Sequence, residues 1–183
     1  MAQICKTLFN SLELATSGRV KPCCLYTDYI TDDDGSHYSL ANSSIDEIFN
    51  SNYMKELRRK SLSGEVIPGC EQCFSEERAG ATSKRQRELK FSANTDNPEL
   101  KRIDIKLGNT CNLKCNICNP FHSSMFNAEN KALGLETINS KYSYNWNDRR
   151  PAWDSLKDIS HTIDHIDFMG GEPMLDKNHV DLL

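Results

Sequence analysis

Two short stretches of the chain alternate between apolar and polar residues, and each is followed by a loop rich in turn-forming residues. The first, RIDIKL at residues 102–107, is β-branched and predicts a strand, and HIDF at residues 165–168 predicts a second one that a glycine pair closes. Pro151 suits the first position of a helix over residues 152–163 between them. A strand, a helix and a second strand with a long crossover indicate a parallel pair, as in a (β/α) barrel.

The first half of the chain has a different pattern. Residues 18–30 contain β-formers interrupted by a proline and predict a hairpin-like piece around Cys23. A helix is expected to start at Ser44, with Glu47 completing a capping box, and to stop at Gly64. Residues 74–91 predict a second, highly charged helix, whose KRQRELK run we interpret as a solvated face.

Composition and charge favour some classes of protein for this chain and exclude others. It has 183 residues, a net charge of -4, 38% hydrophobic and 26% charged residues, as expected of a soluble, globular protein. The acidic balance argues against nucleic-acid binding, which needs excess lysine and arginine. No secretory signal and no apolar run long enough to cross a membrane are visible, so the expected location is cytoplasmic.

Eight cysteines are unusual in a cytoplasmic chain, where disulfides are disfavoured. Clustered cysteines in that compartment usually bind metal or carry out redox chemistry. They form three groups along the sequence, namely Cys5 with Cys23 and Cys24, Cys70 with Cys73, and Cys111 with Cys115 and Cys118. Two separate metal sites would account for seven of the eight.

The third group follows the predicted strand at once, with the spacing CxxxCxxC. Thiolates are the ligands of iron–sulfur clusters, and three thiolates leave one iron of a four-iron cluster open. An open position is what a metal needs in order to bind a substrate. A structural zinc site formed by Cys111, Cys115, Cys118 and a histidine such as His122 is the alternative.

The segment NTCNLKCNICNP and the later GGEP, each at a predicted strand end, resemble the motifs of the radical S-adenosylmethionine enzymes. The resemblance implies that a 4Fe–4S cluster on the three cysteines binds S-adenosylmethionine and cleaves it reductively to a 5′-deoxyadenosyl radical, which abstracts hydrogen from a substrate. It also implies that the GGEP residues contact S-adenosylmethionine. Ile117 occupies the position at which the family usually has an aromatic residue near the adenine. The five expected contact residues are Ile117, Gly170, Gly171, Glu172 and Pro173. An electron donor such as flavodoxin or ferredoxin and a peptide or protein substrate are also implied.

The other cysteines resemble the auxiliary-cluster domains of the same enzymes, of the SPASM and shorter twitch types. The resemblance rests on three features, namely Cys5, a GxxxxC motif that ends at Cys23, and the CxxC motif of Cys70 and Cys73. It implies one auxiliary 4Fe–4S cluster, although such domains commonly follow the barrel rather than precede it. Four-thiolate zinc remains open, because spacing alone does not separate the two metals. Cys24 is either an alternate ligand or a buried spare thiol.

The expected fold class is α/β, with a small α+β, cysteine-ligated twitch/SPASM-like domain over residues 1–91 and a linker over residues 92–100. Residues 101–183 would then begin a partial (β/α)6 radical S-adenosylmethionine barrel, in a chain that we expect to be truncated. The resulting expectation is a radical enzyme with an incomplete catalytic domain. The alternative is a non-catalytic, zinc-binding interaction module.

Overall fold

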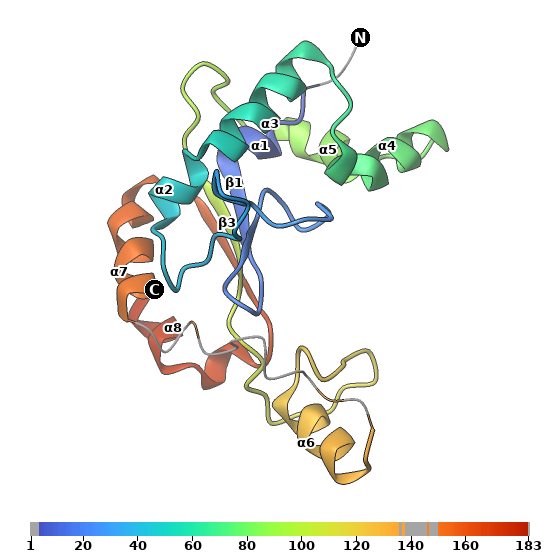
Figure 1. Cartoon of the computed structure of the whole chain (residues 1–183), viewed down its shortest axis with the longest axis vertical. Coiled ribbons are helices and arrows are strands. Elements are labelled where there is room, and N and C mark those ends of the chain that lie inside the picture. The colour runs from blue at the N-terminus through green and yellow to red at the C-terminus, as the bar shows by residue number, and fades with distance from the viewer. Residues whose placement is uncertain (1–3, 136, 138–145, 147–149, 183) are drawn as a thin grey trace.

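The computed structural model describes residues 4–135, 137, 146 and 150–182 (Figure 1). Its centre is a four-stranded sheet in the order β2-β1-β3-β4. The strands are β1 (Ser11–Leu14), β2 (Val20–Lys21), β3 (Arg102–Lys106) and β4 (His165–Met169). The fold is thus a mixed α/β structure, as the sequence predicted, and both predicted strands are present.

The pairing within this sheet is parallel except at one edge. β3 pairs in parallel with β4 and also with β1, whereas β2 runs antiparallel to β1. The predicted parallel pair is therefore confirmed. The hairpin expected around Cys23 is wrong in position, because the hairpin is formed by β1 and β2 and ends at Lys21, before Cys23. Because β1 belongs to the expected N-terminal domain and β3 to the expected barrel, the sheet joins the segments on both sides of the predicted linker.

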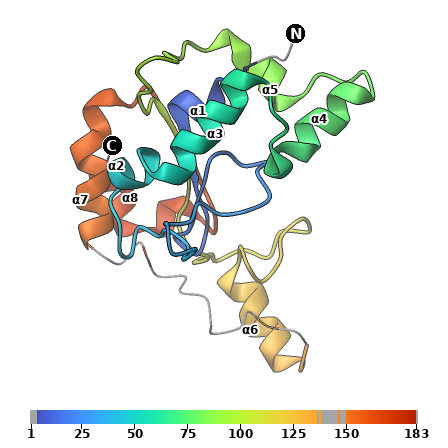
Figure 2. The same ribbon diagram turned by 45° about the horizontal axis from the view of Figure 1, so that its top comes forward.

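The helices lie around the sheet in three groups (Figures 1 and 2). Helices α2, α7 and α8 lie along one side of the sheet, α1, α3, α4 and α5 gather at one end, and α6 lies beyond the opposite end. The α-helices are α1 (Thr7–Asn10), α2 (Ile45–Phe49), α3 (Asn52–Ser63), α4 (Glu71–Arg78), α5 (Lys84–Arg87), α6 (Ser124–Ala132), α7 (Arg150–Ile159) and α8 (Lys177–Leu182). The short 3₁₀ turns are η1 (Pro68–Cys70), η2 (Glu88–Lys90), η4 (Ser160–Thr162) and η5 (Pro173–Leu175).

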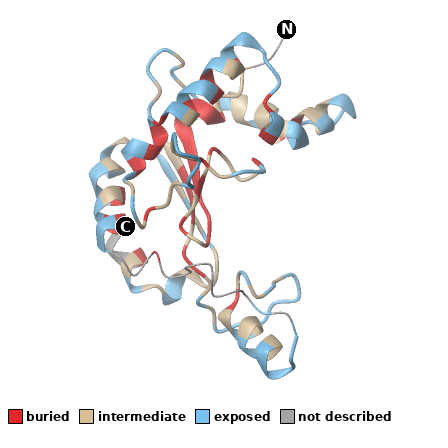
Figure 3. Cartoon of the chain, in the orientation of Figure 1, coloured by how far each residue is buried: buried red, intermediate tan, exposed pale blue. Residues whose placement is uncertain are grey.

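The core lies along the sheet, where the buried residues concentrate (Figure 3). Leu12 is paired with Ile103 and Leu14 with Ile105, so alternate positions place these four fully buried side chains on one face. Trp146 is also fully buried and stacks on Trp153 at 6.3 Å between ring centroids. Both tryptophans therefore pack in the core, as the sequence indicated.

The first predicted helix is divided into α2 and α3, which corrects the expectation of one continuous helix. Ser44 caps α2 by accepting a hydrogen bond from the Glu47 amide, and Gly64 ends α3 with a φ of 73°. Between them the chain leaves the helix at Asn50, and the Ser51 hydroxyl accepts from an amide of the next turn to begin α3. Serine competes with the helix backbone for hydrogen bonds, which favours this restart.

The second predicted helix, over residues 74–91, is also divided. Helix α4 ends at Arg78, and Gly80 follows with a φ of 78°. Helix α5 begins after Ser83, which forms a capping box with Gln86. The divided chain folds back, so Lys84 and Arg85 of α5 lie against the rest of the protein, whereas Arg87 is exposed.

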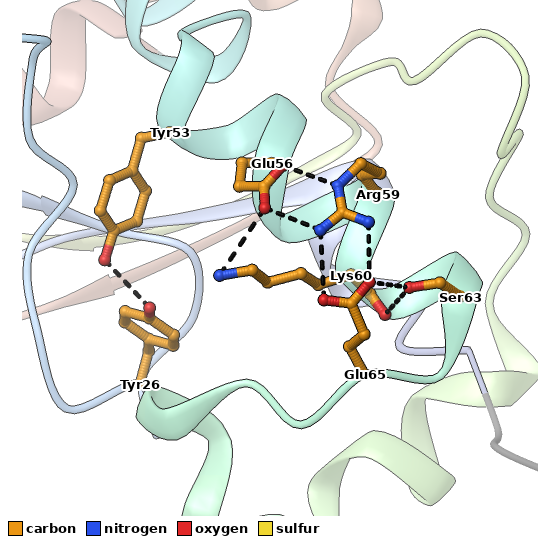
Figure 4. Close-up of polar contacts among 7 residues, drawn as sticks. All are labelled: Tyr26, Tyr53, Glu56, Arg59, Lys60, Ser63 and Glu65. Carbon is orange, nitrogen blue, oxygen red and sulfur yellow. Dashed lines mark hydrogen bonds and ion pairs between the residues drawn. The ribbon is translucent and has the colours of Figure 1, made fainter.

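Arg58 of α3 links this helix to the backbone of α1 and α2 at the amino end of the sheet. Its guanidinium donates to the carbonyl oxygens of Leu8 and Phe49, each at 2.8 Å, and lies 4.2 Å from the Phe49 ring centroid. Burial lowers the pKa of this side chain to about 10. The next residue, Arg59, is exposed and pairs with Glu56 and Glu65 on the surface of α3 (Figure 4).

Replacing Arg58 by methionine should lower the free energy of unfolding by about 2–4 kcal/mol, because two buried carbonyl groups lose charged donors. Urea unfolding followed by circular dichroism measures this change. Arg59→Met is the matched control, and we expect it to have a much smaller effect because exposed ion pairs contribute little. Equal destabilisation by the two substitutions would contradict the role given to Arg58.

Candidate metal centres

The four N-terminal cysteines meet at one pocket. Cys5 precedes α1, Cys23 follows β2, Cys70 ends η1 and Cys73 lies in the first turn of α4. All four line this pocket, together with Tyr26 and other residues of the same region. The structure thus brings together the complete predicted quartet from segments up to 68 residues apart in the sequence.

Close backbone packing holds the CxxC turn beside Cys23. The Thr27 amide donates to the Gly69 carbonyl at 3.2 Å, and the Cys70 amide donates to the Ile67 carbonyl at 2.9 Å. Gly69 lies directly against the Tyr26 ring, where a β-carbon would collide with the aromatic atoms. Tyr26 in turn shares a 3.0 Å hydrogen bond with the Tyr53 hydroxyl on α3 (Figure 4). Glycine is therefore required before Cys70 by a close approach, not by its backbone angles.

The environment of these thiols disfavours their charged forms unless a cation is present. Burial, and to a smaller extent the neighbouring cysteines, raise the pKa of Cys23 and of Cys70 to about 12. Burial also raises the pKa of Cys5. Several buried thiolates at one point repel one another, so a metal centre is what would stabilise them together.

The spacing of the sulfur atoms bears on which metal fits. A tetrahedral zinc ion with sulfurs about 2.3 Å away holds those sulfurs about 3.8 Å from one another. Among the residues that the structure describes, the set of three or more ligand atoms within 4.8 Å of one another is Glu13, Cys24 and Asp104. The cysteine quartet does not meet that limit. An iron–sulfur cluster does not require that spacing, because each of its thiolates binds a different iron.

Two basic residues of α5 lie at the same pocket, and the sequence reasoning missed both. Lys84 and Arg85 line it with the cysteines, and their side chains are only 23% and 10% exposed. Arg85 pairs with Glu77 on α4 and stacks over Phe74. The interpretation of this basic run as a solvated face is therefore wrong for Lys84 and Arg85, whereas Arg87 and Lys90 are exposed as expected. Only the capping signal at Ser83 could have suggested that the helix restarts and turns inward.

Cys24 points to Lys84 instead of joining the quartet at the pocket wall. The Lys84 ammonium donates to the Cys24 sulfur at 2.9 Å and lies 3.8 Å from an Asp104 carboxylate oxygen. Desolvation opposes the charge of Lys84, but the Cys24 hydrogen bond and the Asp104 carboxylate raise its pKa overall. Lys84 thus supplies positive charge to the Glu13, Cys24 and Asp104 group, so this group does not need a metal ion for charge balance.

The second cysteine group lies on the loop that follows β3, at the opposite end of the sheet from the quartet. Ser124, at the start of α6, anchors it: its hydroxyl is 3.2 Å from both the amide and the carbonyl of Cys111. The Cys118 amide donates to the Cys115 carbonyl at 2.9 Å. Cys115 is exposed and the other two are half-buried, so the three thiols lie near the surface.

The GGEP segment at the end of β4 packs directly on this loop. The Gly171 amide donates to Gly108, and the Glu172 amide donates to the Thr110 carbonyl at 2.8 Å, one residue before Cys111. Gly170 has a φ of 97°, and at Gly171 a β-carbon would overlap the backbone of Thr110. The two predicted motifs are therefore adjacent in space, and the glycines are what permits this contact.

The other expected contact residues lie around the same loop. Ile117 is 99% exposed between the last two cysteines, and Pro173 begins η5. The Glu172 side chain accepts a hydrogen bond from the Met174 amide and so caps this turn. His122, the alternative zinc ligand, has its Nδ1 3.4 Å from the Thr16 hydroxyl. It forms no set with the three thiols within 4.8 Å among the described residues.

Comparison with known protein families identifies one similar region. Residues 5–74 match the SPASM family, described as an iron–sulfur cluster-binding domain. The match begins at Cys5 and ends one residue after Cys73, so it spans the whole quartet and supports iron–sulfur binding by this part of the chain. Neither the curated proteins nor the solved structures yielded a match.

Metal-free protein should become less stable as pH rises from about 9 towards about 12. The unfolded chain releases the protons of Cys23 and Cys70 near the ordinary thiol pKa of 9.0, whereas the folded protein retains them up to about 12. The stabilisation that these raised pKa values provide is complete below the unfolded pKa. It is lost as the pH rises from the unfolded towards the folded pKa, because the unfolded state then binds fewer protons than the folded state.

Urea unfolding of the metal-free protein at pH 8 and pH 10 tests this dependence. The C23S/C70S variant is the control, since its loss of stability over the same interval should be smaller than that of the wild type. Identical changes in the two proteins would show that the pKa values of these thiols are not raised in the folded state.

Proposed function

We propose that this chain is part of a radical S-adenosylmethionine enzyme with an auxiliary iron–sulfur cluster. The observation that carries the proposal is the contact between the CxxxCxxC loop and the GGEP segment, through the Glu172 amide and the carbonyl of Thr110. Either motif alone is a weak signal. Their adjacency at the carboxyl ends of neighbouring parallel strands is the position where (β/α) barrels carry their active sites.

The donor set of the loop fits a four-iron cluster. Three thiols offer three ligands, and their exposure leaves room for a further ligand on the fourth iron. When bound, the cluster would supply the electron that cleaves S-adenosylmethionine to a 5′-deoxyadenosyl radical, which abstracts hydrogen from a substrate. The match of residues 5–74 to an iron–sulfur cluster-binding family supports iron over the zinc alternative.

The residues around the loop have roles that follow from their positions. Gly170 and Gly171 let the end of β4 lie against the loop, so that backbone groups rather than side chains face the cofactor. Glu172 holds the turn that follows. Ile117 offers an exposed aliphatic surface to the adenine, where it packs without the stacking that an aromatic ring provides.

The remaining partners are proposed on the same basis. An electron donor such as flavodoxin or ferredoxin would reduce the clusters, and a peptide or protein would be the substrate. None of the eight cysteines, all within the described residues, forms a disulfide, in keeping with a cytoplasmic location. Among the described helices, none is long and apolar enough to cross a membrane.

Anaerobically purified protein should contain two clusters, with about four irons in each. The triple variant C111A/C115A/C118A should lose about half of the iron and sulfide. In the wild type, S-adenosylmethionine should perturb one electron paramagnetic resonance signal, and the triple variant should lack that signal. A variant in which Cys5, Cys23, Cys70 and Cys73 are replaced should retain that perturbed signal. Zinc without sulfide in the wild type would instead identify an interaction module.

Replacing Lys84 by glutamine should lower the midpoint potential of the auxiliary cluster by on the order of 50 mV, because a nearby positive charge favours the reduced, more negative state. Redox titration followed by electron paramagnetic resonance measures it. Lys84→Arg keeps the charge and should keep the potential near that of the wild type. Lys60→Gln, which removes an exposed charge paired with Glu56, is the second control. An unchanged potential in Lys84→Gln would exclude this role.

A further inference from the structure

Cys24 is the cysteine that neither candidate metal centre uses, and it contacts a lysine. The Lys84 ammonium donates to the Cys24 sulfur at 2.9 Å, and no other lysine among the described residues donates to a cysteine sulfur. Cys24 is half-buried and does not line the thiol pocket, so its sulfur is not committed to the quartet. The contact joins the loop that follows β2 to the first residue of α5.

The backbone holds both partners of this contact in place. Lys84 begins α5 directly after Ser83, which is fully buried and caps the helix. On the other side, the Tyr26 amide donates to the Cys23 carbonyl and so fixes the turn through Cys24. Two reactive groups that are held at contact distance react as an intramolecular pair, which is equivalent to a very high local concentration.

The surroundings of Lys84 supply an acceptor for its proton. An Asp104 carboxylate oxygen lies 3.8 Å from the ammonium, and Asp104 is buried. Burial raises the pKa of Asp104, so this carboxylate holds a proton more readily than an exposed one does. The neighbouring Glu13 has one buried oxygen, Oε2, without a hydrogen-bond partner in the described part of the chain. A proton on Asp104 would relieve the repulsion between these two carboxylates.

We propose that Cys24 and Lys84 are an oxidative modification site, at which hydrogen peroxide joins the sulfur to the lysine nitrogen in a sulfenamide bond. Peroxide first oxidises the thiol to a sulfenic acid and is itself reduced to water, and sulfenic acids condense with nearby nitrogen atoms. The ammonium then loses one proton to Asp104 and its nitrogen attacks the sulfur. The S–O bond breaks, and hydroxide leaves as water with a second proton from the amine. The net reaction consumes one peroxide, releases two water molecules and leaves one proton on the carboxylate.

The bridge would change both the charge and the covalent connections of the thiol pocket wall. A nitrogen bonded to sulfur carries no positive charge at neutral pH, so the pocket loses the ammonium that Lys84 provides. Helix α5 becomes tied to the loop that carries Cys23, and both line the pocket. If the proposed auxiliary cluster is present, its midpoint potential should fall, in the direction expected of Lys84→Gln. This consequence alone rests on the proposed function.

Peptide mapping of the anaerobically purified full chain tests the bridge. The protein is treated with hydrogen peroxide, free thiols are blocked with iodoacetamide, and trypsin is applied without reductant. Trypsin does not cleave at Lys84 once its nitrogen is bonded, so residues 20–55 should be linked to residues 79–85, with a mass about 2 Da below the sum of the two peptides. Dithiothreitol should separate them, because its two thiols reduce the S–N bond to a thiol and an amine and become a disulfide. A linked pair about 14 Da above the sum, in which a second peroxide has placed one oxygen between sulfur and nitrogen, also supports the site.

Two substitutions connect the linkage to this pair. Cys24→Ser removes the sulfur, and Lys84→Arg keeps the positive charge but replaces the amine by a guanidinium, which stays protonated. Each should abolish the linked peptides, and in Lys84→Arg the Cys24 sulfur should instead be recovered as sulfinic acid. Lys114 is the internal control, because it precedes the exposed Cys115 but its ammonium binds Glu129 at 2.6 Å, and we expect no linkage there. Circular dichroism of each variant establishes that it is folded.

Three results would overturn the proposal: wild-type Cys24 without a linkage to Lys84, whether oxidised or not, a disulfide between Cys24 and another cysteine in its place, or the same linkage in Lys84→Arg. Iron and sulfide are measured on the same preparations, so the two proposals fail separately. A Cys24–Lys84 linkage in protein that contains zinc and no sulfide would leave the modification site intact and remove only its effect on a cluster potential. Iron-loaded protein without the linkage would remove the modification site alone.

Discussion

The pairing of β1 with β3 fixes the relation between the two cysteine sites. Ser11 to Leu14 lie in register beside Arg102 to Ile105, so the N-terminal segment and the segment leading to Cys111 share one set of backbone hydrogen bonds. Cys5 lies before the amino end of β1, whereas Cys111 lies beyond the carboxyl end of β3. A parallel strand rises about 3.3 Å per residue, so the five residues of β3 alone span roughly 15 Å between them.

The same pairing creates a face of the sheet on which charged groups adjoin one another. Glu13 and Asp104 are direct neighbours across the β1–β3 pair, and both are buried. Two adjacent buried carboxylates are stable only if cations accompany them, and Lys106 and Lys84 provide the charge from either side. Burial nevertheless raises the pKa of Asp104, so its neutralisation by Lys84 is incomplete.

Local signals predicted much of this structure, and long-range contacts account for what they did not. Strand alternation and the caps at Ser44 and Gly64 are encoded within a few residues, and the structure bears out the elements that they predict. The membership of β1 in the central sheet depends on a partner about ninety residues away, which no local pattern reveals. The inward position of Lys84 likewise depends on a chain reversal after Gly80, and a run of charged residues gives no sign of it.

The row of charged side chains links the two ends of the sheet electrostatically. Lys84 lines the thiol pocket and pairs with Asp104, and Asp104 lies beside Glu13. Glu13 in turn binds Lys106 at the wall of a cavity between the β1–β2 hairpin and the end of β3. Two carboxylates form the centre of this row and a lysine lies at each end, at short distances and largely out of water, where screening by salt is weak. A change of charge at the thiol pocket therefore acts first on Lys84 and through its neighbours on the cavity. The cavity and the quartet, though formed by different segments, belong to one electrostatic system.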